Sequence, residues 1–261
     1  MSKMPSILTV IPARYAASRL PGKPLADIAG KPMIVRVLER VLQIPELNQR
    51  GPIVIACDDA RIQAAVEQAG GTAELTSPHH ASGSDRVWEV VERRAQNGEH
   101  YDWILNIQGD EPLLSPEDVN TLLKRAAATP AWDAFTLAAP LEDPEAFTNP
   151  NVVKVVFDDN KRVLYCSRAP IPFDRSQKNG ERGPLEHIYR HIGLYLYKPE
   201  ALKRFTQSPA SILEQLEQLE QLRLLALGLS LHCATVPNAA PGVDTPDDLA
   251  RASELFVNLG L

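Results

Sequence analysis

The sequence predicts an α/β protein with a mostly parallel central sheet and helices on both faces. Short apolar stretches rich in β-branched residues, such as residues 7–11 and 53–57, predict buried strands. Stretches with apolar residues at helical spacing follow them, the first one starting near Pro32. Strands that alternate with helices form parallel sheets, and ligands of such sheets bind beyond the carboxyl ends of the strands.

The first half of the chain repeats this alternation. Residues 102–107 and 135–139 predict two further strands, and Ser115-Pro116 predicts the start of a helix between them. Asp58 can cap the helix that follows the second strand, and Gly70-Gly71 is expected to end it. The loops that follow these strands are therefore the first place to look for a ligand site.

The middle of the chain follows another pattern. Residues 152–157, 163–167 and 191–197 predict strands without a long helix between them, which indicates an antiparallel insertion at approximately 140–200. We expect this insertion to take part in dimerisation. One helix over residues 212–227 should follow, then a strand over 230–236 and a last helix opened by Thr245-Pro246.

Composition narrows the class of protein. The 261 residues, 44% of them hydrophobic, can form one elaborated domain over 1–261. A net charge of -6 argues against nucleic acid or an anionic membrane as the partner. The three cysteines lie far apart without metal-ligand spacing, which favours reduced thiols in a cytoplasmic protein. No signal-peptide layout and no apolar stretch of membrane-spanning length is present.

A basic loop follows the first predicted strand. Arg14, Arg19 and Lys23 lie within ten residues, two prolines stiffen the loop, and Gly22 permits unusual backbone dihedrals. Cations and exposed amides at the end of a strand can clamp a polyphosphate. A solvated surface loop is the alternative, since the loop is neither a Walker A motif nor a GxGxxG sequence.

Two carboxylates follow other predicted strands. Asp110 comes directly after the apolar stretch at 102–107, and Asp244 lies between the last strand and the last helix. Two such carboxylates can share one Mg²⁺, which prefers oxygen ligands and substrate phosphates. The alternatives are a helix cap for Asp244 and a turn residue for Asp110.

Three more groups of polar residues leave both a functional and a structural interpretation open. The segment 79–85, which includes Ser82, can read a base or bind an anion at a helix start, or can simply cap that helix. Arginines can recognise a carboxylate or a phosphate, whereas a histidine among them can equally be structural. The arginines and the histidine are Arg168, Arg175, Arg190 and His191. The glutamates of the 212–227 helix, Glu214, Glu217 and Glu220, are expected mainly on a solvated face.

Taken together, these motifs resemble the CMP-Kdo synthetase family, the 3-deoxy-manno-octulosonate cytidylyltransferases, from about residue 7 to residue 255. The matching segments, in chain order, are IPARYAASRLPGKPLADIAGKPMI, HHASGSDR, NIQGDEPLL, NPNVVKVV, YCSRAPIPFDR, RHIGLYLY, LEQLEQLR and GVDTPDDL. Their order and spacing are more specific than any one of them. Two departures, Ser84 in place of a common Thr and Ser77 where a basic residue can occur, concern details of nucleotide contact.

The resemblance implies a Rossmann-like nucleotidyltransferase fold and a homodimer that transfers CMP from CTP to 3-deoxy-D-manno-octulosonate (Kdo) for lipopolysaccharide biosynthesis. It implies that Arg14, Arg19 and Lys23 contact the CTP phosphates and that Asp110 and Asp244 hold catalytic Mg²⁺. The remaining CTP contacts would come from Ala13, Ser82 and Gln108. The residues implied around the sugar acid are Arg168, Arg175, His191, Tyr195, Glu220 and Gln221.

Two other functions stay open at this point. A cytidylyltransferase for another sugar acid, such as a sialic-acid relative, would carry a similar nucleotide loop. A non-catalytic nucleotide-binding protein could share the fold, because fold alone never establishes activity. A dinucleotide-dependent oxidoreductase is disfavoured, since no GxGxxG motif follows the first strand.

Overall fold

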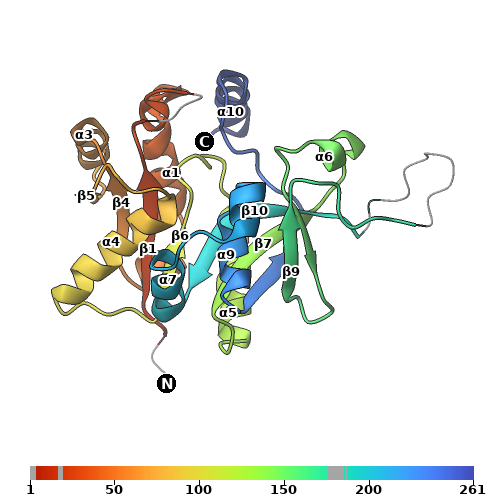
Figure 1. Ribbon diagram of the computed structural model, residues 1–261. Coiled ribbons are helices and arrows are strands. Elements are labelled where there is room, and N and C mark those ends of the chain that lie inside the picture. The colour runs from red at the N-terminus through yellow and green to blue at the C-terminus, as the bar shows by residue number, and fades with distance from the viewer. Residues whose placement is uncertain (1–3, 17–19, 176–184, 186) are drawn as a thin grey trace. The chain divides into compact units, whose positions relative to one another are not determined.

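The computed structural model describes residues 4–16, 20–175, 185 and 187–261. The chain divides into two compact units (Figure 1). Unit 1 comprises Met1–Asn120, Leu196–Thr206 and Ala240–Leu261, and unit 2 comprises Thr121–Tyr195 and Gln207–Ala239. Unit 2 thus takes in more of the chain than the predicted insertion at 140–200. Within the described residues, none of the helices combines the length and the apolar character needed to cross a membrane.

Unit 1 is organised around parallel strands. The central strand β1 (Ile7–Ala13) lies between β4 (Ile53–Cys57) and β6 (Trp103–Asn106), and β5 (Ala73–Leu75) pairs with the far edge of β4. Every residue of β1 and β6 is buried, which explains their mostly apolar sequence. The short strand β5 was not predicted. It has only three residues, none of them buried, so its sequence carries little hydrophobic signal.

Helices cover the strands of unit 1. Helix α4 (Gly83–Gln96) packs on β1 and against α7 (Pro199–Thr206), while α1 (Met33–Leu42) packs against α3 (Ala60–Gln68). The smaller elements are η1 (Lys23–Leu25), the hairpin β2 (Asp27–Ile28) with β3 (Lys31–Pro32), α2 (Pro45–Asn48) and the last helix α10 (Pro246–Leu259). Helix α5 (Pro116–Ala128) begins in unit 1 and ends in unit 2.

Unit 2 combines parallel and antiparallel pairing. Strand β7 (Ala134–Pro140) pairs in parallel with β11 (Leu231–Thr235) and neighbours β10 (Tyr189–Tyr197). Strand β8 (Lys154–Phe157) pairs antiparallel with both β10 and β9 (Val163–Ser167). The short helices are α6 (Pro144–Thr148), α8 (Ile212–Glu217) and α9 (Gln221–Ala226). The predicted fold class, with its mostly parallel sheet and smaller antiparallel part, is confirmed.

The single helix predicted over residues 212–227 is wrong. The chain forms α8 and α9, separated at Gln218, whose φ of 52° is left-handed. The backbone carbonyls of Glu217 and Gln218 accept hydrogen bonds from the guanidinium of Arg168, at 2.7 and 3.2 Å, so the break has a partner fifty residues away. The prediction that Glu214 and Glu217 lie on a solvated face is also wrong. Glu214 pairs with Arg223 at 2.6 Å, and Glu217 accepts from Ser167 at 2.6 Å.

Candidate active site

A cavity of about 410 Å³ opens in unit 1 at the carboxyl ends of its parallel strands. Because β1, β4 and β6 run in the same direction, the loops that follow them reach one edge of the sheet. The residues predicted to bind CTP, apart from Arg19, all line this cavity together with Asp244: Ala13, Arg14, Lys23, Ser82, Gln108 and Asp110. Arg19 lies outside the described residues.

Lys23 lies between the two predicted metal carboxylates. Its Nζ is 2.7 Å from Oδ2 of Asp110 and 3.0 Å from Oδ1 of Asp244. The side chain of Lys23 is only 11% exposed, whereas those of Asp110 and Asp244 are 40% and 55% exposed. The ammonium is therefore held on the cavity wall, and the two carboxylates open toward solvent, where a substrate or an ion can approach.

Local backbone geometry places these three charges. Gly22 precedes η1 with a φ of 71°, a left-handed conformation that glycine adopts without a Cβ clash. A Cβ at Gly109 would lie 2.6 Å from the carbonyl oxygen of Pro12, so only glycine lets this turn approach β1. The N–H of Val243 donates to the carbonyl of Asp110 at 2.9 Å, which brings the two acidic loops together. The sequence predicts that Lys23, Asp110 and Asp244 lie in loops after strands. The local backbone contacts bring the three side chains together in one site.

The helix-cap interpretation of Asp244 is wrong. Thr245 is the N-cap of α10 and forms a capping box with Asp248. The Asp244 carboxylate pairs instead with Lys23. At the start of α4, by contrast, Ser82 fits both the structural and the functional interpretation. It is the N-cap of the helix and forms a capping box with Asp85, and it also lines the cavity.

Sequence reasoning missed a buried ion pair behind the cavity. Arg86 of α4 is 2% exposed, lines the cavity, and lies 2.9 Å from Oδ2 of Asp58. The other oxygen of Asp58 accepts from the backbone N–H of Tyr15 at 2.8 Å, next to Arg14. The predicted helix cap at Asp58 is therefore wrong, and Asp59 caps α3 instead. The available signal was the position of Asp58, directly after a parallel strand, as for Asp110.

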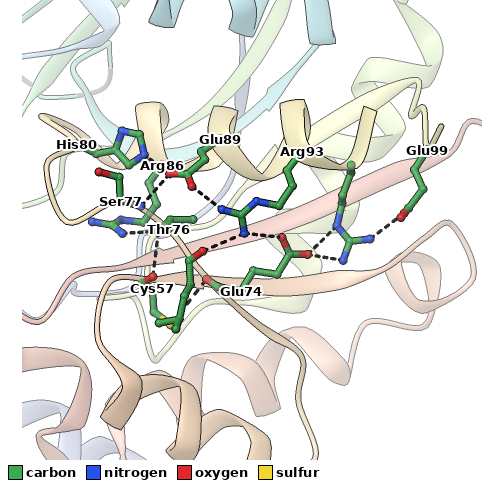
Figure 2. Close-up of polar contacts among 11 residues, drawn as sticks. Cys57, Glu74, Thr76, Ser77, His80, Arg86, Glu89, Arg93 and Glu99 are labelled. Atoms are coloured by element: carbon green, nitrogen blue, oxygen red, sulfur yellow. Dashed lines mark hydrogen bonds and ion pairs between the residues drawn. The ribbon is translucent and has the colours of Figure 1, made fainter. Parts of the chain in front are cut away.

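A row of polar contacts continues along α4 (Figure 2). Arg86 donates to the hydroxyl of Thr76, and Glu89 accepts from His80 at 2.5 Å. His80 is another lining residue of the cavity. These contacts fix the segment between β5 and α4, so the wall that carries Ser82 is anchored along the helix.

The predicted sugar residues belong to unit 2. The guanidinium N–H groups of Arg168 donate hydrogen bonds to three backbone carbonyls, those of Pro150, Glu217 and Gln218. These contacts stabilise the break between α8 and α9. Glu220 is the N-cap of α9 beside this break, and Gln221, 4% exposed, is the first residue of that helix. Arg175 is exposed and adjoins a segment outside the described residues.

His191 and Tyr195 lie on the same strand, with ring centroids 5.5 Å apart. The Nε2 of His191 lies 2.9 Å from the hydroxyl of Thr136, which itself donates to the carbonyl of Ile192. Because that hydroxyl proton is already used, Nε2 of His191 is the donor in this pair. Burial lowers the pKa of His191 to about 4, so the imidazole is neutral at pH 7.

The chain is similar in sequence to proteins of one known family. The Cytidylyltransferase family model matches residues 8–231. A 3-deoxy-manno-octulosonate cytidylyltransferase of Idiomarina loihiensis is 44% identical over 96% of this chain and 98% of its own length. A 3-deoxy-manno-octulosonate cytidylyltransferase of Rhodospirillum centenum is 49% identical over 95% of this chain and 93% of its own length.

Solved structures are also similar. A CMP:2-keto-3-deoxy-manno-octonic acid synthetase complexed with CTP superposes with a TM-score of 0.87, at 41% identity over 97% of this chain and 99% of that one. A 4-diphosphocytidyl-2C-methyl-D-erythritol synthase from Anaerococcus prevotii superposes with a TM-score of 0.60 at 13% identity, covering 97% of this chain and 99% of that one, a likeness of fold alone.

Proposed function

Because the chain belongs to the 3-deoxy-manno-octulosonate cytidylyltransferase family, we propose that it transfers CMP from CTP to Kdo and releases pyrophosphate. The observation that carries this proposal is the cavity of unit 1, where Lys23 lies between Asp110 and Asp244 and residues from four segments of the chain converge. The similar structure that was solved with CTP supports the choice of nucleotide.

Mg²⁺ is part of this proposal, and the residues present fit the ion. Asp110 and Asp244 supply two hard carboxylate oxygens on partly exposed side chains. Mg²⁺ takes one or two carboxylates from a protein and completes its shell with water and substrate phosphates. Among the described residues, no group of three or more His, Cys, Asp or Glu side chains that could hold a metal ion is found. The ion would neutralise charge on the phosphates when bound.

The reaction needs positioning and charge compensation. The C2 hydroxyl oxygen of Kdo forms a bond to the α-phosphorus of CTP, the bond to the bridging oxygen breaks, and pyrophosphate leaves with the electron pair. Lys23 and Arg14, which line the cavity, would hold the phosphates in line for this attack. Asp58 fixes the backbone of Tyr15, so Arg14 projects from an anchored loop. The hydroxyl proton passes to solvent or to a carboxylate of the site.

We propose that the unit 2 residues His191, Tyr195, Glu220 and Gln221 bind the sugar acid, with Arg175 as a further candidate. The contacts of Arg168 make it a positioning residue that shapes the α8–α9 break next to Glu220. A neutral His191, whose Nε2 donates to Thr136, can accept a hydrogen bond at Nδ1 without repelling a bound cation. A homodimer, a cytoplasmic location and a role in lipopolysaccharide biosynthesis complete the proposal.

The test is a panel of substrates in which pyrophosphate release is measured. CTP, UTP, ATP and GTP are each combined with Kdo, and CTP is then combined with sialic acid and with an 8-amino Kdo analogue, with and without Mg²⁺. We expect release only with CTP, Kdo or a close analogue, and Mg²⁺ together. Release with sialic acid in place of Kdo would assign another sugar acid. The absence of release from every pair would indicate a non-catalytic nucleotide-binding protein.

A further inference from the structure

A second cavity lies in unit 2, away from any residue predicted for the reaction. It measures about 610 Å³ and is lined by the end of α5, the turn between β8 and β9, and the start of β11. His232, which lines it, is the register partner of Phe135 near the amino ends of the parallel strands β11 and β7. Substrates of parallel sheets bind at the carboxyl ends, so this cavity lies at the opposite edge of that strand pair.

His232 has an unsatisfied polar atom at this cavity. The residue is 2% exposed, and its Nδ1 has no hydrogen-bond partner in the described part of the chain. The imidazole is held between Trp132 and Phe135, with ring centroids 5.1 and 5.5 Å away. Buried polar atoms in proteins are nearly always hydrogen-bonded, so an unpartnered nitrogen in a residue that lines a cavity calls for a ligand that would pair with it.

Three cations surround the same cavity: Arg125, Lys161 and Arg162. Within the described residues, none of them has a carboxylate at ion-pair distance. Lys161 is fixed by its backbone, because its N–H donates to the carbonyl of Asp158 and its carbonyl accepts from Cys233, both at 2.8 Å. The Lys161 ammonium lies over the Phe157 ring, 4.5 Å from its centroid, so Arg125 and Arg162 are the charge donors offered to an oxyanion.

Two acidic residues of the turn between β8 and β9 also line the cavity. They lower its expected affinity for an anion, but the net charge of its lining side chains stays positive. Asp158 directs one carboxylate oxygen to the backbone N–H of Arg162 at 2.9 Å, and Asp159 is exposed. Three cations therefore outweigh two carboxylates, one of which is already engaged. We propose that this cavity binds a small oxyanion of the phosphate class, with Arg125 and Arg162 as charge partners and His232 Nδ1 as a hydrogen-bond partner. The modest charge excess predicts a dissociation constant in the millimolar range.

The imidazole of His232 is itself a reporter for the test. Protein with labelled histidine is titrated with inorganic phosphate at constant pH and ionic strength, and the His232 ring signals are assigned by their loss in His232→Gln. We expect a saturable shift that equal ionic strength of sodium chloride does not produce. A parallel titration with succinate separates a phosphate site from a carboxylate site. A linear response, or the same shift with chloride, would overturn the proposal.

Charge variants with a matched control locate the site. The double variant Arg125→Gln/Arg162→Gln should raise the dissociation constant for phosphate at least tenfold. Lys124→Gln, which removes an exposed charge from the same helix outside the cavity, should leave it unchanged. The titration is repeated with saturating CTP in the absence of Kdo, and the His232 shift should persist. Loss of the shift with CTP, or its survival in the double variant, would contradict an independent oxyanion site.

Discussion

Replacing Lys23 by Met tests the arrangement of charges in the first cavity. The Lys23 ammonium lies within hydrogen-bonding distance of both Asp110 and Asp244, so the two carboxylates lie within about 6 Å of each other. At that separation their repulsion is roughly 1 kcal/mol in a water-like dielectric and about 3 kcal/mol at an effective dielectric constant of 20. Both carboxylates are substantially exposed, so the lower figure applies.

Lys23→Met should therefore change metal binding and catalysis in opposite directions. Without the ammonium, the uncompensated carboxylates should bind Mg²⁺ more tightly in the absence of nucleotide, by about fivefold, the factor that corresponds to roughly 1 kcal/mol. Pyrophosphate release should fall by about 10²- to 10³-fold in kcat/KM, the usual loss when one preorganised charge contact is removed. Calorimetric titration with MgCl₂ measures the first effect, and steady-state kinetics with CTP and Kdo measures the second.

The control is Lys31→Met, which removes the same charge from an exposed lysine that pairs with Glu39 outside the cavity. It should alter neither quantity. Unchanged or weaker Mg²⁺ binding by Lys23→Met would refute the reasoning that the ammonium and the ion compete for the same two carboxylates. An unchanged kcat/KM would remove Lys23 from the reaction, whatever the metal result.

Three further predictions concern the reaction and the stability of the fold. Asp110→Asn should stay folded, with an unfolding midpoint near that of the parent, yet lose about 10²-fold or more in kcat; near-normal turnover at saturating Mg²⁺ would sink the metal assignment. Lys154→Met should lower the free energy of unfolding by about 2–4 kcal/mol in a urea titration, because the buried ammonium donates to three carbonyls, those of Asn149, Val152 and Arg168; an unchanged midpoint would contradict this. Burial lowers the pKa of His191 and of His232 to about 4, so the unfolded chain binds more protons than the folded one between pH 6.5 and 4. The free energy of unfolding should therefore fall as the pH is lowered through this window, by up to about 3 kcal/mol for each histidine. The fall should be smaller in the double variant His191→Gln/His232→Gln. Equal pH profiles of unfolding free energy for the parent and the variant would contradict this prediction.

The sequence predicts the nucleotide side of the site well, because its signals are local. Arg14 and Asp110 come soon after buried strands, Lys23 and Asp244 lie in loops that follow strands, and the carboxyl ends of parallel strands meet at one edge. Lys23, Asp110 and Asp244 were thus placed together without knowledge of any contact between them. Gly22 was likewise predicted from residue type alone, and its left-handed φ agrees.

The errors arise where a distant residue decides between local alternatives. Asp58 and Asp59 both follow a strand, and either can cap α3. Arg86 settles the choice, because it pairs with Asp58 from 28 positions away and leaves Asp59 to cap the helix. No local pattern distinguishes the two aspartates.

The α8–α9 break has a similar cause. The LEQLEQLEQL run places leucine at every third residue, whereas an α-helix turns once per 3.6 residues, so one straight helix would wind these leucines around its surface. The break at Gln218 instead leaves Leu216 76% exposed and buries Leu219 and Leu222. The mismatch in period was visible in the sequence. The position of the break was not, because it depends on the guanidinium of Arg168.

The charges of the first cavity are largely compensated before any substrate arrives. Lys23 is shared by Asp110 and Asp244, and Arg86 is paired with Asp58. Among the described lining residues, Arg14 is the cation without an ion pair. A single arginine does not neutralise a triphosphate, so the proposed reaction needs further countercharge. In that proposal, Asp110 and Asp244 would hold Mg²⁺, which would neutralise charge on the phosphates, and the Lys23 ammonium would then be available to the leaving pyrophosphate. Because Lys23 would serve both the carboxylates and the phosphates, its removal should tighten Mg²⁺ binding and weaken catalysis.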